Sequence, residues 1–274
     1  MQQHLDYYSL VGFKPDSTLP DELDRLGLSA QQTALLVDFD GTLVDIAPTP
    51  GSIRVTSSDK ALLDQLHARH GGALAIVSGR NLEEIVHYLD TFKGTISGGH
   101  GAELRRNART LPGIDCNFDR LEHIKSAVME FAVIDPRVIA EDKRFGIVLH
   151  FRQHPEVEGK VRDFVGCLIE DDEEFEMQSA KMAIEIKPKD VSKARAIERI
   201  MQFDEFRGRD IVFAGDDTTD EVAFAWVNGQ GGTTIKVGEG VTAAQYRTAN
   251  PASFKKWLRA QFNSAQLKLA RQGN

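Results

Sequence analysis

Short apolar runs alternate with helical segments along most of the chain, and this alternation limits the folds open to it. The segment TALLVDFD (33–40) predicts a buried strand, because an apolar run precedes its polar end. A helical pattern follows over 57–72, ALAIVSGR (73–80) predicts a second short strand, and 81–89 is helical again. Such an alternation predicts a parallel sheet covered by helices on both faces.

The middle of the chain has a different pattern, in which one helix is followed by two strands, twice over. We predict helices over 118–134 and 155–174, each followed by a pair of strands, over 137–152 and 175–188. This order is typical of a small α+β unit with an open antiparallel sheet. A domain of this kind is therefore predicted to interrupt the first pattern.

The alternation of strands and helices returns after this segment. It predicts a helix at 193–203, a strand at 210–217, a helix at 219–227, a strand at 232–238 and a closing helix at 251–272. The closing helix could be a dimer face, although packing on its own core is the favoured interpretation. We therefore predict an α/β fold with a Rossmann-like parallel-sheet core. Residues 1–110 and 188–274 form this core, and 111–187 form an inserted α+β cap domain.

Composition excludes several classes of partner. The 274 residues carry a formal net charge of −8, which argues against nucleic acid or an anionic membrane as the main partner. The sequence holds no run of 18 apolar residues, and its start lacks the pattern of an export signal. The two cysteines, Cys116 and Cys167, have no second Cys or His at ligand spacing, so we expect neither a disulfide nor a zinc site. These features indicate a cytoplasmic protein.

Two aspartates, Asp38 and Asp40, stand at the end of the first predicted strand. Residues two apart on a strand project to the same face, and ligands of open parallel sheets bind beyond the carboxyl ends of the strands. Both carboxylates are thus expected at one pocket mouth, where a divalent cation would offset their repulsion. Taken alone, the pair is more often a turn that caps the next segment.

Other predicted strand ends deliver compatible polar groups. Ser78 and Arg80 follow the second strand, and Asp216 and Asp217 follow the strand at 210–217, with Asp220 a turn further on. Each of these alone is more often a turn or a helix cap. Lys193 at the start of a predicted helix is, by itself, more often a solvated lysine. Compatible polar groups at several strand ends at once occur by chance much more rarely than any one of these features.

Together these groups suit phosphoryl transfer. A carboxylate can attack phosphorus and divide one hard displacement into two easier ones, while a second carboxylate moves protons. Mg²⁺ would neutralise charge between the anionic nucleophile and the anionic phosphate, and a hydroxyl and an ammonium would hold the phosphate oxygens. The sequence lacks a GxxxxGK[ST] loop, which removes the main support for a nucleoside triphosphatase.

The segments DFDGTL (38–43), VSGR (77–80) and GDDTTDE (215–221), with Lys193 between the last two, resemble the four ordered motifs of the haloacid dehalogenase superfamily of phosphatases. The resemblance implies Asp38 as nucleophile, Asp40 as general acid and base, and Ser78 and Lys193 as phosphate-binding catalytic residues. It implies a Mg²⁺ site made by Asp38, Asp40 (through its backbone carbonyl) and Asp216. Supporting roles fall to Asp217, Asp220 and Arg80.

Within that superfamily, GGHGAE (98–103), EDKRFGIVLHFR (141–152) and KMAIEIKP (181–188) resemble the trehalose-6-phosphate phosphatase family, over residues 34 to about 238. The resemblance implies substrate-binding roles for seven residues: Gly99, His100, Glu141, Lys143, Arg152, Lys181 and Glu185. A disaccharide exposes many hydroxyl groups, which carboxylates can bind as acceptors and basic side chains can bind as donors. The family often has Lys-Gly and His-Tyr-Arg where this chain has Lys193-Ala194 and His150-Phe151-Arg152. Without the surrounding motifs, these charges would be an ordinary exposed sheet face.

The resemblance implies a Mg²⁺-dependent hydrolase that acts on trehalose 6-phosphate, in trehalose biosynthesis. The alternative within enzymes is a phosphatase for another sugar phosphate, such as sucrose 6-phosphate or glucosylglycerol phosphate. A less favoured alternative is a non-catalytic sugar-phosphate sensor, in which the catalytic aspartates are often lost. We expect a small-molecule substrate, no nucleic-acid or membrane partner, and a monomer in preference to an oligomer.

Overall fold

The computed structural model of the chain describes residues 23, 26–47, 50–114, 116–180 and 182–272. It divides into two compact units, which we call the core unit (1–112 and 192–274) and the inserted unit (113–191). Both boundaries between the units lie a few residues beyond the predicted limits of 110 and 188. The last strand of the inserted unit runs to Pro188. Each unit is described by itself.

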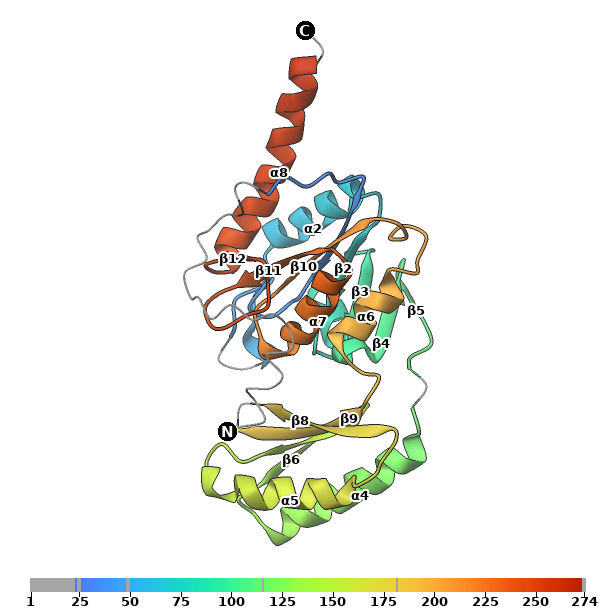
Figure 1. The fold of residues 1–274 in the computed structure, drawn as a ribbon, viewed down its shortest axis with the longest axis vertical. Coiled ribbons are helices and arrows are strands. Elements are labelled where there is room, and N and C mark those ends of the chain that lie inside the picture. The colour runs from blue at the N-terminus through green and yellow to red at the C-terminus, as the bar shows by residue number, and fades with distance from the viewer. Residues whose placement is uncertain (1–22, 24–25, 48–49, 115, 181, 273–274) are drawn as a thin grey trace. The chain divides into compact units, whose positions relative to one another are not determined.

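An eight-stranded sheet forms the centre of the core unit (Figure 1). In space its order is β12-β11-β10-β1-β2-β3-β4-β5, with parallel pairing from β12 to β3 and antiparallel pairing of β4 and β5. In chain order its strands are β1 (Thr33–Val37), β2 (Leu74–Val77), β3 (Thr95–Gly98), β4 (Glu103–Arg106), β5 (Arg109–Thr110), β10 (Asp210–Gly215), β11 (Thr233–Val237) and β12 (Tyr246–Thr248).

Helices bury both faces of this sheet. Side chains alternate along β1, so Leu35 and Val37 enter one hydrophobic cluster while Ala34 and Leu36 enter the other. The first cluster includes residues of three helices, α2 (Ser57–Arg69), α3 (Leu82–Tyr88) and α8 (Pro251–Gln272). The second includes residues of α6 (Lys193–Ile200) and α7 (Thr218–Gly229). A sheet buried on both faces needs the continuous apolar runs seen in the sequence.

The order of the strands also fixes where a ligand can bind. From β1 the chain moves outward through β2 and β3 on one side, while β10, β11 and β12 extend the sheet on the other. The direction of winding therefore reverses between β1 and β10. In open α/β sheets the ligand crevice lies at this reversal, beyond the carboxyl ends of the strands.

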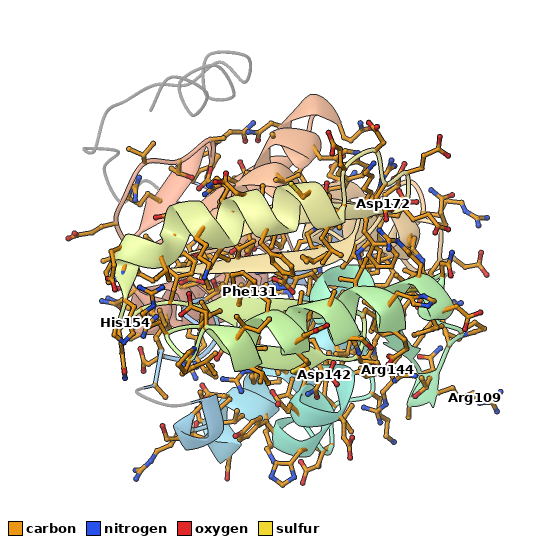
Figure 2. The ribbon with its side chains drawn as sticks, turned by 90° about the horizontal axis from the view of Figure 1, so that it is seen from below. Arg109, Phe131, Asp142, Arg144, His154 and Asp172 are labelled. Atoms are coloured by element: carbon orange, nitrogen blue, oxygen red, sulfur yellow. The ribbon has the colours of Figure 1, made fainter. Side chains whose placement is uncertain are left out.

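The inserted unit is a four-stranded antiparallel sheet with two helices on one face. The strands, in the spatial order β6-β7-β9-β8, are β6 (Ile139–Lys143), β7 (Gly146–His150), β9 (Ala183–Pro188) and β8 (Phe175–Ala180). The helices α4 (Phe118–Ile134) and α5 (Glu158–Leu168) lie side by side (Figure 2). Between them Phe131 stacks on Phe164, with ring centroids 4.2 Å apart.

The predicted fold class, a parallel-sheet α/β core with an α+β insertion, is confirmed. The helix predicted over 155–174 is wrong at both ends. A 3₁₀ turn at Pro155–Val157 precedes α5, and the acidic stretch after it turns, with Asp171 in the left-handed region at φ 57°. Among the described residues, the structure has no helix both long enough and apolar enough to cross a bilayer.

Candidate active site

The end of β1 places Asp38 at the reversal point of the sheet. Its backbone N–H donates to the carbonyl of Ala214 in β10 at 2.9 Å, and its side chain is buried. The chain then turns at Gly41, which adopts a φ of +75°. A Cβ at Gly41 would lie 2.0 Å from an oxygen of Asp216, so glycine allows the Asp216 carboxylate to reach this turn.

The end of β10 is organised by the start of α7. Asp217 is the N-cap of that helix, and its carboxylate accepts the N–H of Thr218 at 2.7 Å. Asp220 completes the capping box, and one of its oxygens accepts the N–H groups of Asp216 and Asp217, both at 3.0 Å. The supporting aspartates therefore fix the backbone from which the Asp216 carboxylate projects.

Lys193 joins the ends of β1 and β10. Its ammonium lies 2.8 Å from Oδ1 of Asp38 and 2.7 Å from Oδ1 of Asp220, and these three side chains are at most 5% exposed. Burial lowers the pKa of Lys193, but the carboxylates of Asp220 and Asp38 more than offset this, so its pKa is raised. The lysine is therefore a fixed positive charge in the crevice.

Excess negative charge remains at this point. Burial raises the pKa of Asp38 well above its ordinary value, although Lys193 opposes the rise, and burial also raises the pKa of Asp216. One carboxylate oxygen from each of Asp38, Asp216 and Asp220 lies within 4.8 Å of the others. Three carboxylates against one ammonium leave two formal negative charges, so a divalent cation would restore neutrality.

The donors suit a hard cation such as Mg²⁺, which prefers oxygen ligands. The Asp220 oxygens are already engaged, one by Lys193 and the other by two backbone N–H groups. Asp38 and Asp216 are therefore the carboxylates left to hold the ion, and Asp220 supports them. The Asp216 carboxylate lies against the turn at Gly41, and the backbone carbonyl of Asp40, which precedes this glycine, could supply a further oxygen ligand.

Thr42 was missed in the sequence. Its hydroxyl lies 3.4 Å from Oδ2 of Asp38 and 3.3 Å from Oδ1 of Asp216, so it links the two carboxylates. Thr42 is fully buried. The signal that could have found it is its place in DFDGTL, one residue after the glycine turn.

Asp40 is held by Arg80. Nε and Nη2 of the guanidinium donate to the two carboxylate oxygens at 2.6 and 2.7 Å, which is a bidentate pair. This hydrogen bonding raises the pKa of Arg80. Asp40 is 33% exposed, against 5% for Asp38, so the two aspartates predicted together occupy different environments.

The loop after β2 and the turn after β3 are joined. Ser78 is buried, and its Oγ accepts the N–H of Arg80 at 3.2 Å. The N–H of Gly99 donates to the Arg80 carbonyl at 2.7 Å, and the N–H of His100 donates to the Ser78 carbonyl at 3.0 Å. A Cβ at Gly79 would lie 2.4 Å from the His100 ring, so the imidazole lies directly against this loop. The structure thus brings four predicted residues together.

Glu103 is a second residue that the sequence analysis missed. This buried carboxylate accepts the N–H of Leu82 at 2.9 Å, at the first residue of α3. It therefore ties β4 to the helix that follows the Ser78 loop. A lone Glu at the start of a short strand carries no local signal for such a contact.

Three of the predicted sugar-binding residues, Glu141, Lys143 and Glu185, lie in the inserted unit, on the sheet face away from its helices. The register aligns Glu141, Val148, Glu185 and Gln178 in one row across the four strands. Facing residues of neighbouring strands share a sheet face, and the alternate residues, including Ile147 and Ile186, enter the hydrophobic cluster with the helices. We call the opposite face, which carries this row, the open face.

Charged groups pair along the open face. Lys143 lies 3.6 Å from Glu185, and Nε2 of His150 lies 2.6 Å from Oε2 of Glu141. Arg152 is exposed and follows the end of β7. Lys181 lies outside the described residues. His150 was not predicted as a site residue, because its partner is set by the pairing of two strands.

Comparison with known proteins matches the chain to a family of phosphatases. Residues 36–254 match the trehalose-phosphatase family. The trehalose-6-phosphate phosphatase of Escherichia coli (strain K12) is 34% identical over 234 residues, which cover 82% of this chain and 85% of that protein.

Solved structures show the same fold. A trehalose-6-phosphate phosphatase related protein has a TM-score of 0.64 at 27% identity, and the match covers 85% of this chain and 98% of that one. A haloacid dehalogenase-like hydrolase from B. subtilis has a TM-score of 0.60 at 14% identity, covering 82% and 99%. The second likeness concerns the fold alone.

Proposed function

The chain belongs to the trehalose-phosphatase family, and from this membership we propose that it hydrolyses trehalose 6-phosphate to trehalose and phosphate. The observation that carries the proposal is the set of buried Asp38, Lys193 and Asp220 with half-buried Asp216 at the reversal point of the sheet. This set has the charges that phosphoryl transfer needs, and it lies where α/β sheets bind their ligands.

Asp38 is the proposed nucleophile. One of its oxygens is held by Lys193 at 2.8 Å, which fixes the direction of the carboxylate and favours its ionised form. A carboxylate oxygen attacks phosphorus, and the bond between phosphorus and the sugar oxygen breaks. The product is a phosphoryl group bonded to Asp38.

Asp40 is the proposed proton carrier. It would give a proton to the departing sugar oxygen, and then take one from the water that attacks the phosphorylated Asp38, so that phosphate leaves and both aspartates are restored. Both oxygens of Asp40 accept hydrogen bonds from Arg80. The proposal therefore requires this pair to loosen before the proton moves.

We propose that Asp38 and Asp216, with the backbone carbonyl of Asp40, hold Mg²⁺. When bound, the ion would neutralise negative charge between the nucleophile and the phosphate. The support is the two uncompensated charges and the oxygen donors described above. Ser78 and Lys193 supply the hydroxyl and the ammonium proposed to bind the phosphate oxygens.

We propose that the inserted unit binds the sugar, through Glu141, Lys143, Arg152, Lys181 and Glu185. Its charged groups are acceptors and donors suited to hydroxyls, and those described are partly exposed. Gly99 and His100 are proposed to contact the substrate from the core unit, where they adjoin the Ser78 loop. Another sugar phosphate is the alternative substrate, because the groups proposed to bind phosphate would bind any of them.

The test is phosphate release from a panel of sugar phosphates, with and without EDTA. We expect trehalose 6-phosphate to be the best substrate, and we expect EDTA to abolish release until Mg²⁺ is restored. Ca²⁺ should restore it poorly, because its looser and larger coordination would misplace the Asp38 carboxylate. Full activity in EDTA would contradict the metal site, and a preference for sucrose 6-phosphate would contradict the substrate. Binding without turnover would favour the sensor.

We also propose a monomer in the cytoplasm. The sequence holds only two cysteines, Cys116 and Cys167, a usage that suits a reducing compartment. Sedimentation of the purified protein tests the oligomeric state. One species with the mass of a single chain would support the proposal, and a stable dimer would contradict it.

A further inference from the structure

The backbone of Asp216 is held on both sides by buried charged groups. Its N–H donates to the Asp220 carboxylate at 3.0 Å, and its carbonyl accepts a hydrogen bond from the ammonium of Lys236. Lys236 lies in β11, where it pairs with Gly215, the last residue of β10. Its side chain therefore runs along the strand end to the turn that carries Asp216.

Lys236 is an unusual residue at this position. It is only 4% exposed and lies in a strand that is otherwise apolar or Thr. Burying an ammonium is costly unless it is hydrogen-bonded or paired with a negative charge. The first condition is met here, since it donates to the Asp216 carbonyl. Its charge also lies close enough to Glu221 to oppose the rise in the pKa of that carboxyl that burial causes.

Glu221 connects the same region to the loop after β11. It is a buried residue in the first turn of α7, and one of its oxygens accepts the N–H of Ala243 at 2.7 Å. Its negative charge offsets that of Lys236. The lysine can therefore hold the Asp216 carbonyl without leaving a net positive charge beside a cation site.

We propose that Lys236 is a positioning residue for the divalent cation, which it supports by fixing the backbone of Asp216. The inference rests on the proposed function, because it takes Asp216 as a ligand of Mg²⁺. Groups that orient metal ligands from behind typically contribute 10- to 100-fold to metal affinity. Lys236 itself would touch neither the ion nor the substrate.

Mg²⁺ binding to the substrate-free protein, measured by isothermal titration calorimetry, tests the proposal. We expect Lys236→Met to raise the Kd for Mg²⁺ by about 10- to 100-fold, and Lys236→Arg, which keeps the charge and the donor, to stay within about threefold of wild type. In assays of trehalose 6-phosphate, the Met variant should need more Mg²⁺ for half-maximal rate. At saturating Mg²⁺ its KM for the sugar phosphate should be unchanged.

A matched control is Lys187→Met in the inserted unit. Lys187 is also a buried lysine whose ammonium donates to a backbone carbonyl, that of Val191 at 2.5 Å, and it pairs with Glu176. Its removal should lower the thermal stability and leave the Kd for Mg²⁺ unchanged.

If Lys236→Met does not fold, Lys236→Gln, which keeps a shorter neutral donor, is measured in its place. The expected loss of Mg²⁺ affinity is then at least about threefold.

The outcomes separate the two proposals. An unchanged or lower Kd for Mg²⁺ in a folded Met or Gln variant overturns the role of Lys236, since repulsion by the lysine would then match or exceed its positioning effect. An equal loss in Lys187→Met also overturns it. A wild-type protein that neither binds Mg²⁺ nor releases phosphate overturns the proposed function together with this inference.

Discussion

The charged groups of the candidate active site and those of the open face lie in different surroundings. In the core unit, Asp38, Lys193 and Asp220 are almost fully buried, and the ammonium of Lys193 lies 2.8 Å from Asp38 and 2.7 Å from Asp220. On the open face of the inserted unit, the side chains of Glu141, His150 and Lys143 are 36 to 52% exposed. Buried charges interact strongly and resist rearrangement, whereas exposed pairs are weak and exchange easily with water or a ligand.

This difference suggests a division of work. A phosphate group and a cation are the same for every phosphate monoester, so a rigid, desolvated site serves all of them. Sugars differ in the placement of hydroxyls, and exposed side chains can replace bound water with those hydroxyls. Variants of the nucleophile and of the groups that bind the phosphate and the cation should therefore affect all substrates alike, and variants on the open face should affect only sugar substrates.

The largest expected effect is that of Asp38→Asn. An amide cannot attack phosphorus, so we expect turnover to fall by about 10⁴-fold or more. The loss should be equal for trehalose 6-phosphate and p-nitrophenyl phosphate, because both need the same nucleophile. Circular dichroism should show an intact fold, and a folded variant with a near wild-type rate would rule out the covalent mechanism.

Asp40→Asn should have the next largest effect. Loss of a general acid and base typically costs about 10²- to 10⁴-fold, and we expect this for trehalose 6-phosphate. The loss should be smaller for p-nitrophenyl phosphate, because p-nitrophenolate leaves without being protonated. Steady-state rates on both substrates check this, and an undiminished rate with trehalose 6-phosphate would remove Asp40 from the mechanism.

The sequence predicts the core of the fold well, because the central strands leave a strong local signal. β1, β2 and β10 are apolar runs buried on both faces, so their positions follow from composition. β3, β4, β5 and β12 were not predicted. They are short, with two to four residues each, and lack the continuous apolar run that marks the central strands.

The same distinction, between residues with a strong local signal and residues without one, applies to the candidate active site. Asp38 and Asp216 follow directly from predicted strand ends, so their meeting at one edge could be expected. The contacts of Lys236 with Asp216 and of Arg80 with Asp40 depend on strand order and on the path of long side chains. No local pattern encodes them, and a lysine within an apolar strand indicates only that some buried partner exists.

A smaller effect is expected on the open face. Glu185→Ala or Arg152→Ala should lower kcat/KM for trehalose 6-phosphate by about one to two orders of magnitude, equivalent to about 1.5–3 kcal/mol, the typical contribution of a hydrogen bond to a charged group. p-Nitrophenyl phosphate, which has no sugar, should be hydrolysed at the wild-type rate. Equal losses on both substrates would show that these residues support folding or general catalysis instead.

Asp142→Ala is the matched control for Glu141→Ala. Asp142 is the next residue along β6, so it projects to the opposite face, where it pairs with Lys125 at 2.7 Å. Only Glu141→Ala should affect kcat/KM for trehalose 6-phosphate. If both variants lose the same activity, the two faces are not distinguished by function.

The smallest expected effect concerns acid stability, where the two units should again differ. In the inserted unit, hydrogen bonds from Arg137 and Lys160 to Asp135 hold the pKa of that carboxyl far below its ordinary value. A lowered folded-state pKa stabilises the fold above the unfolded-state pKa of about 3.9, and this contribution is lost as the pH falls below it. The raised pKa of Asp38 in the core unit acts in the opposite sense, because its protonated form is favoured by folding. Hydrogen-exchange protection factors of α4 and β7 should therefore fall as the pH is lowered from about 4 to about 2, and fall less in Asp135→Asn. Asp163→Asn, which changes an exposed aspartate of α5, should keep the wild-type response. If Asp135→Asn and wild type lose protection equally, Asp135 does not contribute to the acid sensitivity of this unit.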